Sequence, residues 1–218
     1  MPRAFTAVEK ETIREKLMAA GRTCFLRYGL KKTTIEDLTK PAGIAKASFY
    51  LFFDSKEDLF IEVFMEEIPA MMQRLTDMSF GATDDTREAL VLLMKGIVGE
   101  MEKNAMARIL MDDPSEIERI ASSFDYEAVL QRVAPTFAPM LQAIANAQGR
   151  GEIIEGDPFL ISYSLGLVKM LAFNRDRIPP PLYEQMTDLA PQIIADGLTC
   201  PARSRTSRPS DGANEATT

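Results

Sequence analysis

Apolar residues recur every three or four positions along most of this chain, the spacing of helices that bury one face. In the first segment these positions are Ile13, Leu17, Ala20, Cys24 and Tyr28. Thr6 and Glu9 have the spacing of a capping box at its start, and Gly29 is a suitable helix stop at its end. The pattern therefore predicts a first helix of about six turns.

Two short helices are predicted next. Either Thr33 or Thr34 can cap the first of them, and the segment 41–43 (Pro-Ala-Gly) is expected to end it, because the proline disfavours helical geometry at Lys40 and Gly43 supplies a tight turn. A further helix must begin only two residues later, because four apolar residues share one face there: Ala45, Phe49, Phe52 and Phe53.

The rest of the chain also has helical periodicity. Ser55 caps a fourth helix that Pro69 should kink or split. Later helices are expected over 84–103, 105–111, a short piece from Pro114, 125–148 with interruptions at Pro135 and Pro139, 158–174 and 182–198. No segment alternates like a strand, so the predicted fold is all-α with about nine helices. Residues 199–218 are polar and rich in Pro, Arg and Ser, which predicts a disordered tail.

The charge is unevenly distributed along the chain. The net charge is −7, but residues 1–60 carry 11 Lys and Arg against 8 Asp and Glu, whereas the remainder carries 14 against 24. A mildly basic first segment on an acidic body fits a DNA-binding module that repels DNA elsewhere. No apolar run is long enough to span a membrane and no secretory signal is present, so we expect a cytoplasmic protein.

The residue types available argue against most enzymes. The chain has no histidine, which excludes Ser-His-Asp or Cys-His catalysis and histidine-ligated zinc. Its two cysteines, Cys24 and Cys200, cannot form a disulfide framework, and Cys24 is best explained as a small buried residue. No catalytic residue, metal site or cofactor is predicted. The alternative is a metal-dependent enzyme built on the acidic cluster Asp112, Asp113, Glu116 and Glu118, for which an exposed helix start is the simpler explanation.

The two short helices around Gly43, with the long first helix across them, have the layout of a helix-turn-helix. If Ala45, Phe49 and Phe53 face the core, then Lys46, Ala47, Tyr50 and Leu51 point outward, with Ser48 at the edge. One lysine, one tyrosine and small side chains suit a surface that enters a major groove about 12 Å wide. Lys46 and Ser48 can each bond a phosphate or a base edge, and Tyr50 can donate its hydroxyl to a phosphate.

Residues 33–38 (Thr-Thr-Ile-Glu-Asp-Leu) and 42–59 resemble the DNA-binding signature of the TetR/AcrR family. The most specific part is the sequence Phe-Tyr-x-x-Phe-x-Ser-Lys-Glu at 49–57, and the resemblance covers about residues 10–65. Three positions depart from the family pattern: Pro41 replaces a common helix former, Ala45 replaces the usual Ser or Thr cap, and Phe52 replaces His or Tyr.

The resemblance implies a transcription regulator, most simply a repressor that a small, largely apolar effector releases from a palindromic operator. It implies DNA contacts from Thr33 or Thr34, Lys46, Ala47, Ser48, Tyr50 and Lys56. It also implies a helix-turn-helix domain over 1–54, an effector-binding and dimerisation domain over 55–198, and the tail at 199–218. The expected partners are duplex DNA, a second copy of the chain and an effector, with the protein located at the bacterial nucleoid.

Two further sets of residues follow from this layout. The last two helices are expected to form the dimer interface through Ser162, Gly166, Leu182, Met186, Leu189 and Ile193. Eleven of the 13 methionines lie between 61 and 198, and flexible methionines can line an adaptable pocket. The predicted lining is Met94, Ile97, Met101, Asn104, Phe137, Met140, Tyr163 and Phe173. Packing within one subunit is the alternative for both sets, and a helical interaction protein without DNA binding is the alternative for the whole chain.

Overall fold

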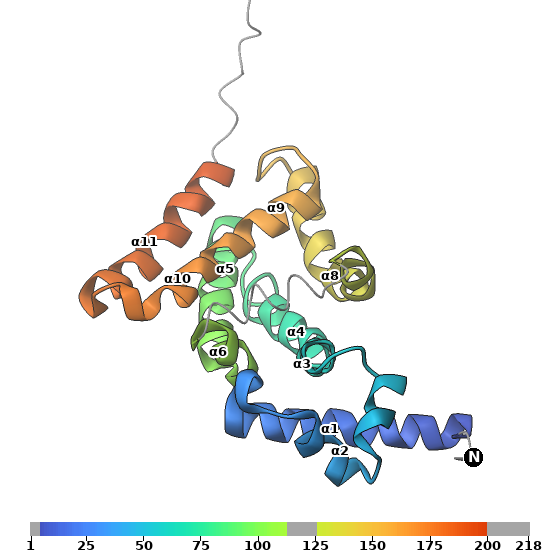
Figure 1. Ribbon diagram of the computed structural model, residues 1–218. Helices are drawn as coiled ribbons and strands as arrows, with labels where there is room; N and C mark the ends of the chain where they lie inside the picture. The colour runs from blue at the N-terminus through green and yellow to red at the C-terminus, as the bar shows by residue number, and fades with distance from the viewer. Residues whose placement is uncertain (1–4, 113–125, 200–218) are drawn as a thin grey trace, which may run out of the picture.

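The computed structural model describes residues 5–112 and 126–199, and over these ranges it contains helices and turns but no strand (Figure 1). The all-α prediction is confirmed. The elements are α1 (Ala7–Lys32), α2 (Ile35–Ala42), the 3-10 helix η1 (Lys46–Leu51), α3 (Lys56–Met65), α4 (Ile68–Met78), α5 (Thr86–Lys103), α6 (Ala105–Asp112), α8 (Tyr126–Gly149), α9 (Pro158–Leu165), η2 (Gly166–Val168), α10 (Lys169–Phe173), η3 (Arg175–Arg177) and α11 (Pro180–Thr199). The predictions for a helix at Pro114, for the acidic cluster beyond Asp112 and for the tail fall outside the described residues.

The caps expected on the first two helices are present. The Thr6 hydroxyl accepts from the Glu9 amide at 3.2 Å, and the Glu9 carboxylate accepts from the Thr6 amide at 2.8 Å. Gly29 has φ +74°, which breaks the regular path of α1 one turn before its end. Thr34, rather than Thr33, caps α2, and a second capping box with Asp37 completes that turn.

The segment 41–43 ends α2 as expected. The expectation that Pro41 disfavours helical geometry at Lys40 was wrong, because both residues lie inside the helix, which continues to Ala42. A proline at this position removes the amide that would bond the carbonyl of Asp37, four residues earlier. The Cys24 thiol lies 3.8 Å from that carbonyl and donates to it. Burial raises the pKa of Cys24, so the thiol keeps its proton and remains a donor. Gly43, in the left-handed region at φ +72°, then ends the helix.

The other prolines have two different outcomes. Pro69 splits the predicted fourth helix into α3 and α4, as expected, and lies in the first turn of α4, where its missing amide costs nothing. Pro135 and Pro139 do not interrupt α8, which runs unbroken from Tyr126 to Gly149, so that prediction was wrong. Both of these prolines are exposed, so water can satisfy the carbonyls that they leave unpaired.

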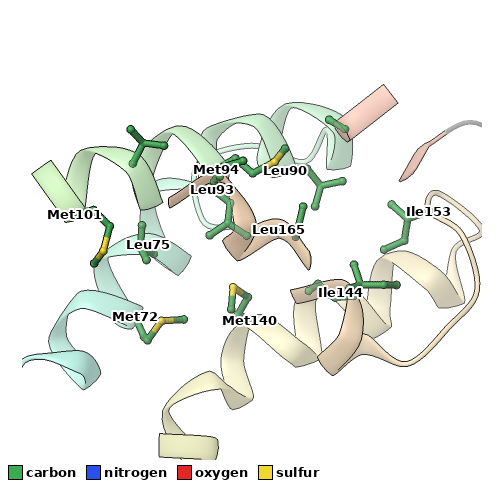
Figure 2. Packing of buried hydrophobic residues seen from close by; sticks show 14 of the residues in the cluster. Met72, Leu75, Leu90, Leu93, Met94, Met101, Met140, Ile144, Ile153 and Leu165 are labelled. Atoms are coloured by element: carbon green, nitrogen blue, oxygen red, sulfur yellow. The ribbon is translucent and has the colours of Figure 1, made fainter. Parts of the chain in front are cut away.

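Two apolar cores hold the molecule together. The core of the head (α1, α2, η1 and α3, residues 5–65) centres on Leu17, Phe25, Leu38, Phe49 and Phe60, and Met106 of α6 also belongs to it. The core of the body (α4 to α11, residues 68–199) is formed by Leu75, Leu90, Leu93, Met140 and Leu165, among others. Figure 2 shows Met72, Met101 and Met140 extending from three different helices toward the same region of this core. The α3–α4 pair connects the two cores (Figure 1).

Helix α11 packs on α5 through a buried face and several polar ties. Tyr183 and Ala195 are buried, and the Tyr183 hydroxyl donates to Glu102 of α5 at 2.7 Å. Lys95 pairs with Asp188 at 2.6 Å, and Arg87 pairs with Asp196 at 2.5 Å. These contacts leave the opposite face of α11 without a partner in the described chain. The predicted single helix over 158–174 is divided into α9 and α10 by the 3-10 turn η2.

Candidate DNA-binding surface and ligand cavity

The recognition segment η1 is anchored by two phenylalanines. Phe49 is fully buried and Phe53 nearly so, with their ring centroids 5.8 Å apart. The Arg14 guanidinium of α1 lies 4.6 Å from the centre of the Phe53 ring and donates to Glu62 of α3 at 2.7 Å. The long helix α1 and the helix α3 thus hold η1 from both sides, so its outer face is rigidly placed.

The outer face of η1 has the composition that the sequence predicted. Lys46, Ala47 and Tyr50 are exposed, Leu51 is exposed beside them, and Ser48 is half-buried at the edge. The segment is a 3-10 helix rather than an α-helix. Ala45 was expected to face the core but is exposed at the N-cap, where it supplies no side-chain cap. The first amides of this turn therefore have no side-chain acceptor, whereas the Ser48 amide donates to the Ala45 carbonyl at 2.9 Å.

Thr33 and Lys56 have structural partners instead of free polar groups. Thr33 is buried and its hydroxyl donates to the carbonyl of Gly29 at 2.7 Å. The Lys56 ammonium donates to the carbonyls of Leu30, Lys31 and Thr33 at 2.7–3.0 Å, which uses all three of its protons at the end of α1. In this structure neither side chain is available to a phosphate. Thr34 is exposed, with its hydroxyl donating to the Asp37 carboxylate at 2.6 Å.

A partly open cavity of about 310 Å³ lies between α3 of the head and α4, α5, α6, α8, α9 and α10 of the body. Its lining is largely apolar and consists of Phe64, Ile68, Met71, Met72, Leu75, Ile97, Glu100, Met101, Ala107, Ala134, Phe137, Met140, Phe159, Ser162, Tyr163, Gly166, Lys169 and Phe173. This volume lies at the lower end of the range for small-molecule sites. The cavity is large enough for a compact organic ligand.

The structure brings most of the predicted pocket residues together. Ile97, Met101, Phe137, Met140, Tyr163 and Phe173 line this cavity. Met94 does not: it is fully buried in the core, one turn further along the same face of α5. Asn104 does not line the cavity either, because its side chain caps α6 and bonds Glu67. Binding of an effector by the lining residues stays a prediction.

Sequence reasoning missed the contribution of α4 to the lining. Ile68, Met71, Met72 and Leu75 all face the cavity. These positions are three, four and seven residues apart, which is the spacing of one helix face and could have identified them. Pro69 lies among these residues, and from the sequence it predicts only a break in the helix.

Glu67, at the α3–α4 junction, connects three parts of the chain. Its carboxylate forms a close ion pair with Arg22 of α1 and accepts from the Asn104 side-chain amide at 2.7 Å. The side-chain oxygen Oδ1 of Asn104 in turn accepts from the backbone amide of Ala107 at 2.8 Å, and Ala107 lines the cavity. Glu66 also pairs with Arg22, at 3.1 Å. A short chain of polar contacts thus joins the head to the cavity wall.

Comparisons with known proteins identify relatives of this chain and a family match for its head. A family model described as bacterial regulatory proteins of the tetR family matches residues 17–63, which run from α1 through η1 into α3. The HTH-type transcriptional regulator YhgD of Bacillus subtilis, itself uncharacterized, is 26% identical over 194 residues, covering 85% of this chain and 97% of that protein. Residues 17–63 thus match the DNA-binding region of the TetR family. The curated relatives that the chain resembles are transcriptional regulators of the helix-turn-helix type.

Other regulators resemble the chain over shorter stretches or in fold. The repressor KstR2 of Mycolicibacterium smegmatis is 27% identical over 113 residues, which is 52% of this chain and 55% of that repressor. A TetR-family regulator from Pectobacterium atrosepticum has the same fold, with a TM-score of 0.67 at 21% identity over 90% of this chain and 98% of that one. FadR of Bacillus subtilis, solved with stearoyl-CoA, has a TM-score of 0.56 at 17% identity over 84% of this chain and 98% of that one.

The predicted dimer residues divide into two groups. Leu182, Leu189 and Ile193 of α11 are exposed, and Met186 lines a shallow apolar groove between α10 and α11. Ser162 and Gly166 were expected on the same outer face, but both line the inner cavity, and Ser162 is buried against Met140. The exposed apolar residues of the preceding segment are Leu160, Tyr163, Leu167 and Met170.

Two negative findings apply to the described part of the chain. Within residues 5–112 and 126–199, no group of three or more Cys, Asp or Glu side chains is arranged to hold a metal ion. None of the helices described there is long and apolar enough to cross a membrane.

Proposed function

We propose that this TetR-family regulator is a homodimeric repressor that leaves a palindromic operator when a small, largely apolar effector fills the cavity of the body. The proposal places it in the bacterial cytoplasm, on the nucleoid. It keeps the division into a DNA-binding domain (1–54), a sensing and dimerisation domain (55–198) and a tail (199–218), although the core of the head continues into α3.

Phe64 is the observation on which the proposal mainly rests. This side chain of α3 packs against the core of the head, packs against the core of the body and lines the cavity. A ligand that displaces Phe64 must therefore repack the helix that carries the recognition segment. Because a packed interior changes between discrete arrangements rather than deforming smoothly, a small displacement there favours a different head position.

The DNA-binding part of the proposal rests on η1. Lys46, Ser48 and Tyr50 offer polar groups on a face otherwise made of Ala47 and Leu51, and Thr34 is exposed at the start of α2. Lys46 and Ser48 can bind a phosphate or a base edge, and Tyr50 can bind a phosphate. Thr33 and Lys56 enter this proposal as residues that position the turn, not as DNA ligands.

The dimer part rests on the uncovered apolar face of α10 and α11. Leu182, Leu189 and Ile193 are 49%, 57% and 60% exposed, and the groove beside them is lined by apolar side chains, including Met186. Monomeric proteins rarely leave a contiguous apolar face of this kind in water. Pairing of two such faces about a two-fold axis gives a four-helix interface and sets the spacing of the two heads.

The effector acts through its preference between two head spacings. Two recognition segments must lie about 34–36 Å apart, or a similar multiple of the helical repeat, to enter successive major grooves. An effector that binds more tightly to a dimer with another spacing lowers the operator affinity by the same factor as its own preference. The contacts from Arg22 through Glu67 to Asn104 are one route for this coupling.

The test is selection of fragments from sheared genomic DNA by the purified full-length chain, followed by sequencing. We expect a few enriched fragments that share an inverted repeat, with binding that weakens steeply as salt is raised. The matched control is a Lys46→Ala, Tyr50→Phe double variant, which should enrich none of them. Absence of any enriched sequence with the folded wild-type protein at low salt would overturn the proposal.

A further inference from the structure

The polar groups of the cavity wall are few and they are not equivalent. Ser162 is buried with its hydroxyl 4.0 Å from the sulfur of Met140, so it presents little to a ligand. Tyr163, Glu100 and Lys169 are the remaining polar side chains of the lining. Two of these three carry a full charge, and the sign of the charge that remains after pairing determines which ligands the cavity attracts.

The carboxylate of Glu100 is already neutralised. Arg74 of α4 donates to both of its oxygens, at 3.3 and 2.5 Å. A forked arginine–carboxylate pair of this kind is among the stronger polar contacts in proteins. Glu100 therefore contributes little negative potential to the cavity.

The ammonium of Lys169 has no such partner. It lies 5.7 Å from the centre of the Tyr163 ring, and in the described part of the chain no carboxylate is within salt-bridge distance of it. The Tyr163 ring also stacks on Phe159, another lining residue, with the centroids 6.3 Å apart. Lys169 thus places one uncompensated positive charge beside an aromatic wall of the cavity.

Volume limits the size of the ligand. A cavity of about 310 Å³ holds on the order of ten non-hydrogen atoms if each occupies roughly the 30 Å³ of a liquid water molecule. A ligand of this size must be apolar over most of its surface to match the methionine and phenylalanine lining. Among the described lining residues, only Lys169 offers such a ligand a charge that no ion pair neutralises.

From the proposed function of the cavity as an effector site, we propose that the effector is a compact monoanionic amphiphile: a carboxylate, bound by the ammonium of Lys169, on an apolar body of about ten carbons. A neutral ligand of the same size would leave Lys169 unpaired. A cationic ligand would meet like charge at the one polar end of the cavity.

The experiment compares three probes that differ only in the end group: decanoate, decanol and decylamine. Isothermal titration calorimetry at neutral pH gives their affinities for the full-length protein. We expect decanoate to bind about tenfold more tightly than decanol, because a hydrogen bond to a charged group exceeds a neutral one by about that factor. Decylamine should bind most weakly.

Two variants test the role of Lys169. Lys169→Gln should bring the ratio of decanoate to decanol affinity close to one, and Lys169→Arg should restore most of the preference. The matched control is Lys95→Gln, which removes an equal charge from the side of α5 that pairs with α11. It should keep the tenfold ratio.

The outcomes separate this inference from the proposed function. Equal binding of decanoate and decanol by the wild type, or a preference that persists in Lys169→Gln, would overturn the charge assignment and leave an apolar effector site standing. If none of the three probes binds, the apolar effector site itself is wrong and this inference fails with it.

Discussion

At the residue scale, the two lysines of the family signature have opposite roles. Lys46 is exposed on the outer face of η1, whereas Lys56 donates to three carbonyls at the end of α1. The sequence gives both the same charge and similar neighbours. Only the fold distinguishes them, because the partners of Lys56 lie 23 to 26 residues away along the chain.

We predict that Lys46→Ala weakens operator binding and lowers the slope of log affinity against log salt by about one, since one phosphate contact is lost. If Lys46 instead bonds a guanine edge, the loss will be confined to one base position. Fluorescence anisotropy with labelled operator at several salt concentrations distinguishes the two.

Lys56→Met, the companion variant, should leave that salt slope unchanged and reduce the free energy of unfolding by about 1–3 kcal/mol, because it leaves carbonyls of α1 without a charged donor. Urea unfolding followed by circular dichroism measures this. A reduced salt slope with unchanged stability would show that Lys56 contacts DNA after all.

Glu152 gives a prediction on pH at the same scale. Its carboxylate accepts from Arg150 at 2.7 and 2.8 Å and from the Thr86 hydroxyl at 2.5 Å, which ties the turn after α8 to the start of α5. Arg150 first, and then Thr86, lower the pKa of Glu152 from about 4.5 to about 2. A lowered pKa in the folded state stabilises the fold above the unfolded value and loses that effect as pH falls toward the folded value.

We therefore expect the stability difference between wild type and Glu152→Gln to be constant above pH 4.5 and to shrink steadily toward pH 2. Urea midpoints at half-unit pH intervals measure it. Glu155→Gln, an exposed neighbour in the same turn, is the control and should show no such trend. A difference that does not depend on pH would contradict the assignment of this carboxylate.

At the scale of elements, the junction between α3 and α4 links the head to the body (Figure 1). Glu67 lies there, between Arg22 of α1 and Asn104 before α6. Its neighbour Glu66 contacts Arg22 only once, at 3.1 Å, and is more exposed. The two glutamates are therefore a matched pair for mutation.

We predict that Glu67→Ala lowers the free energy of unfolding by about 1–2 kcal/mol and weakens operator binding several-fold without changing the salt slope, because no DNA contact is removed. Glu66→Ala should have little effect on either. Thermal unfolding and anisotropy titrations provide both readings. Equal effects from the two variants would contradict a special role for Glu67.

The sequence predicted elements where the signal was local. The capping boxes, the left-handed Gly43 and the break at Pro69 each depend on residues within four positions of one another, and each was found where expected. The errors arose where a distant contact decided the outcome. Cys24 binds the carbonyl that Pro41 leaves free, and the ammonium of Lys56 bonds carbonyls 23 to 26 residues away instead of facing DNA.

The cavity lining was predictable in part, because helix periodicity is also a local signal. The helix face of α5 that carries Ile97 and Met101 follows from periodicity, but the point at which the cavity ends along that face does not. Met94 lies just past that point and is packed in the core. Periodicity also fails to predict which face of the α9–η2 segment meets the cavity. Ser162 of α9 and Gly166 of η2 line the cavity and not the outer surface.

At the scale of the whole molecule, we propose that the uncovered face of α11 forms the dimer interface. We predict that Leu189→Glu combined with Ile193→Glu converts the protein to a folded monomer and lowers operator affinity by more than about tenfold, because the interface would then bury two unpaired charges. Light scattering coupled to gel filtration gives the mass. Leu26→Glu, on an exposed site of α1, should remain dimeric. A double variant that stays dimeric would mean that the dimer forms through another surface.

Phe64 and Met106 have a consequence for how the protein melts. Phe64 packs against both cores, and Met106 belongs to the core of the head although its helix follows α5 of the body. Neither core can come apart without exposing side chains that the other one holds. Heating should therefore produce a single cooperative transition, with calorimetric and van't Hoff enthalpies in agreement, in place of separate steps for head and body.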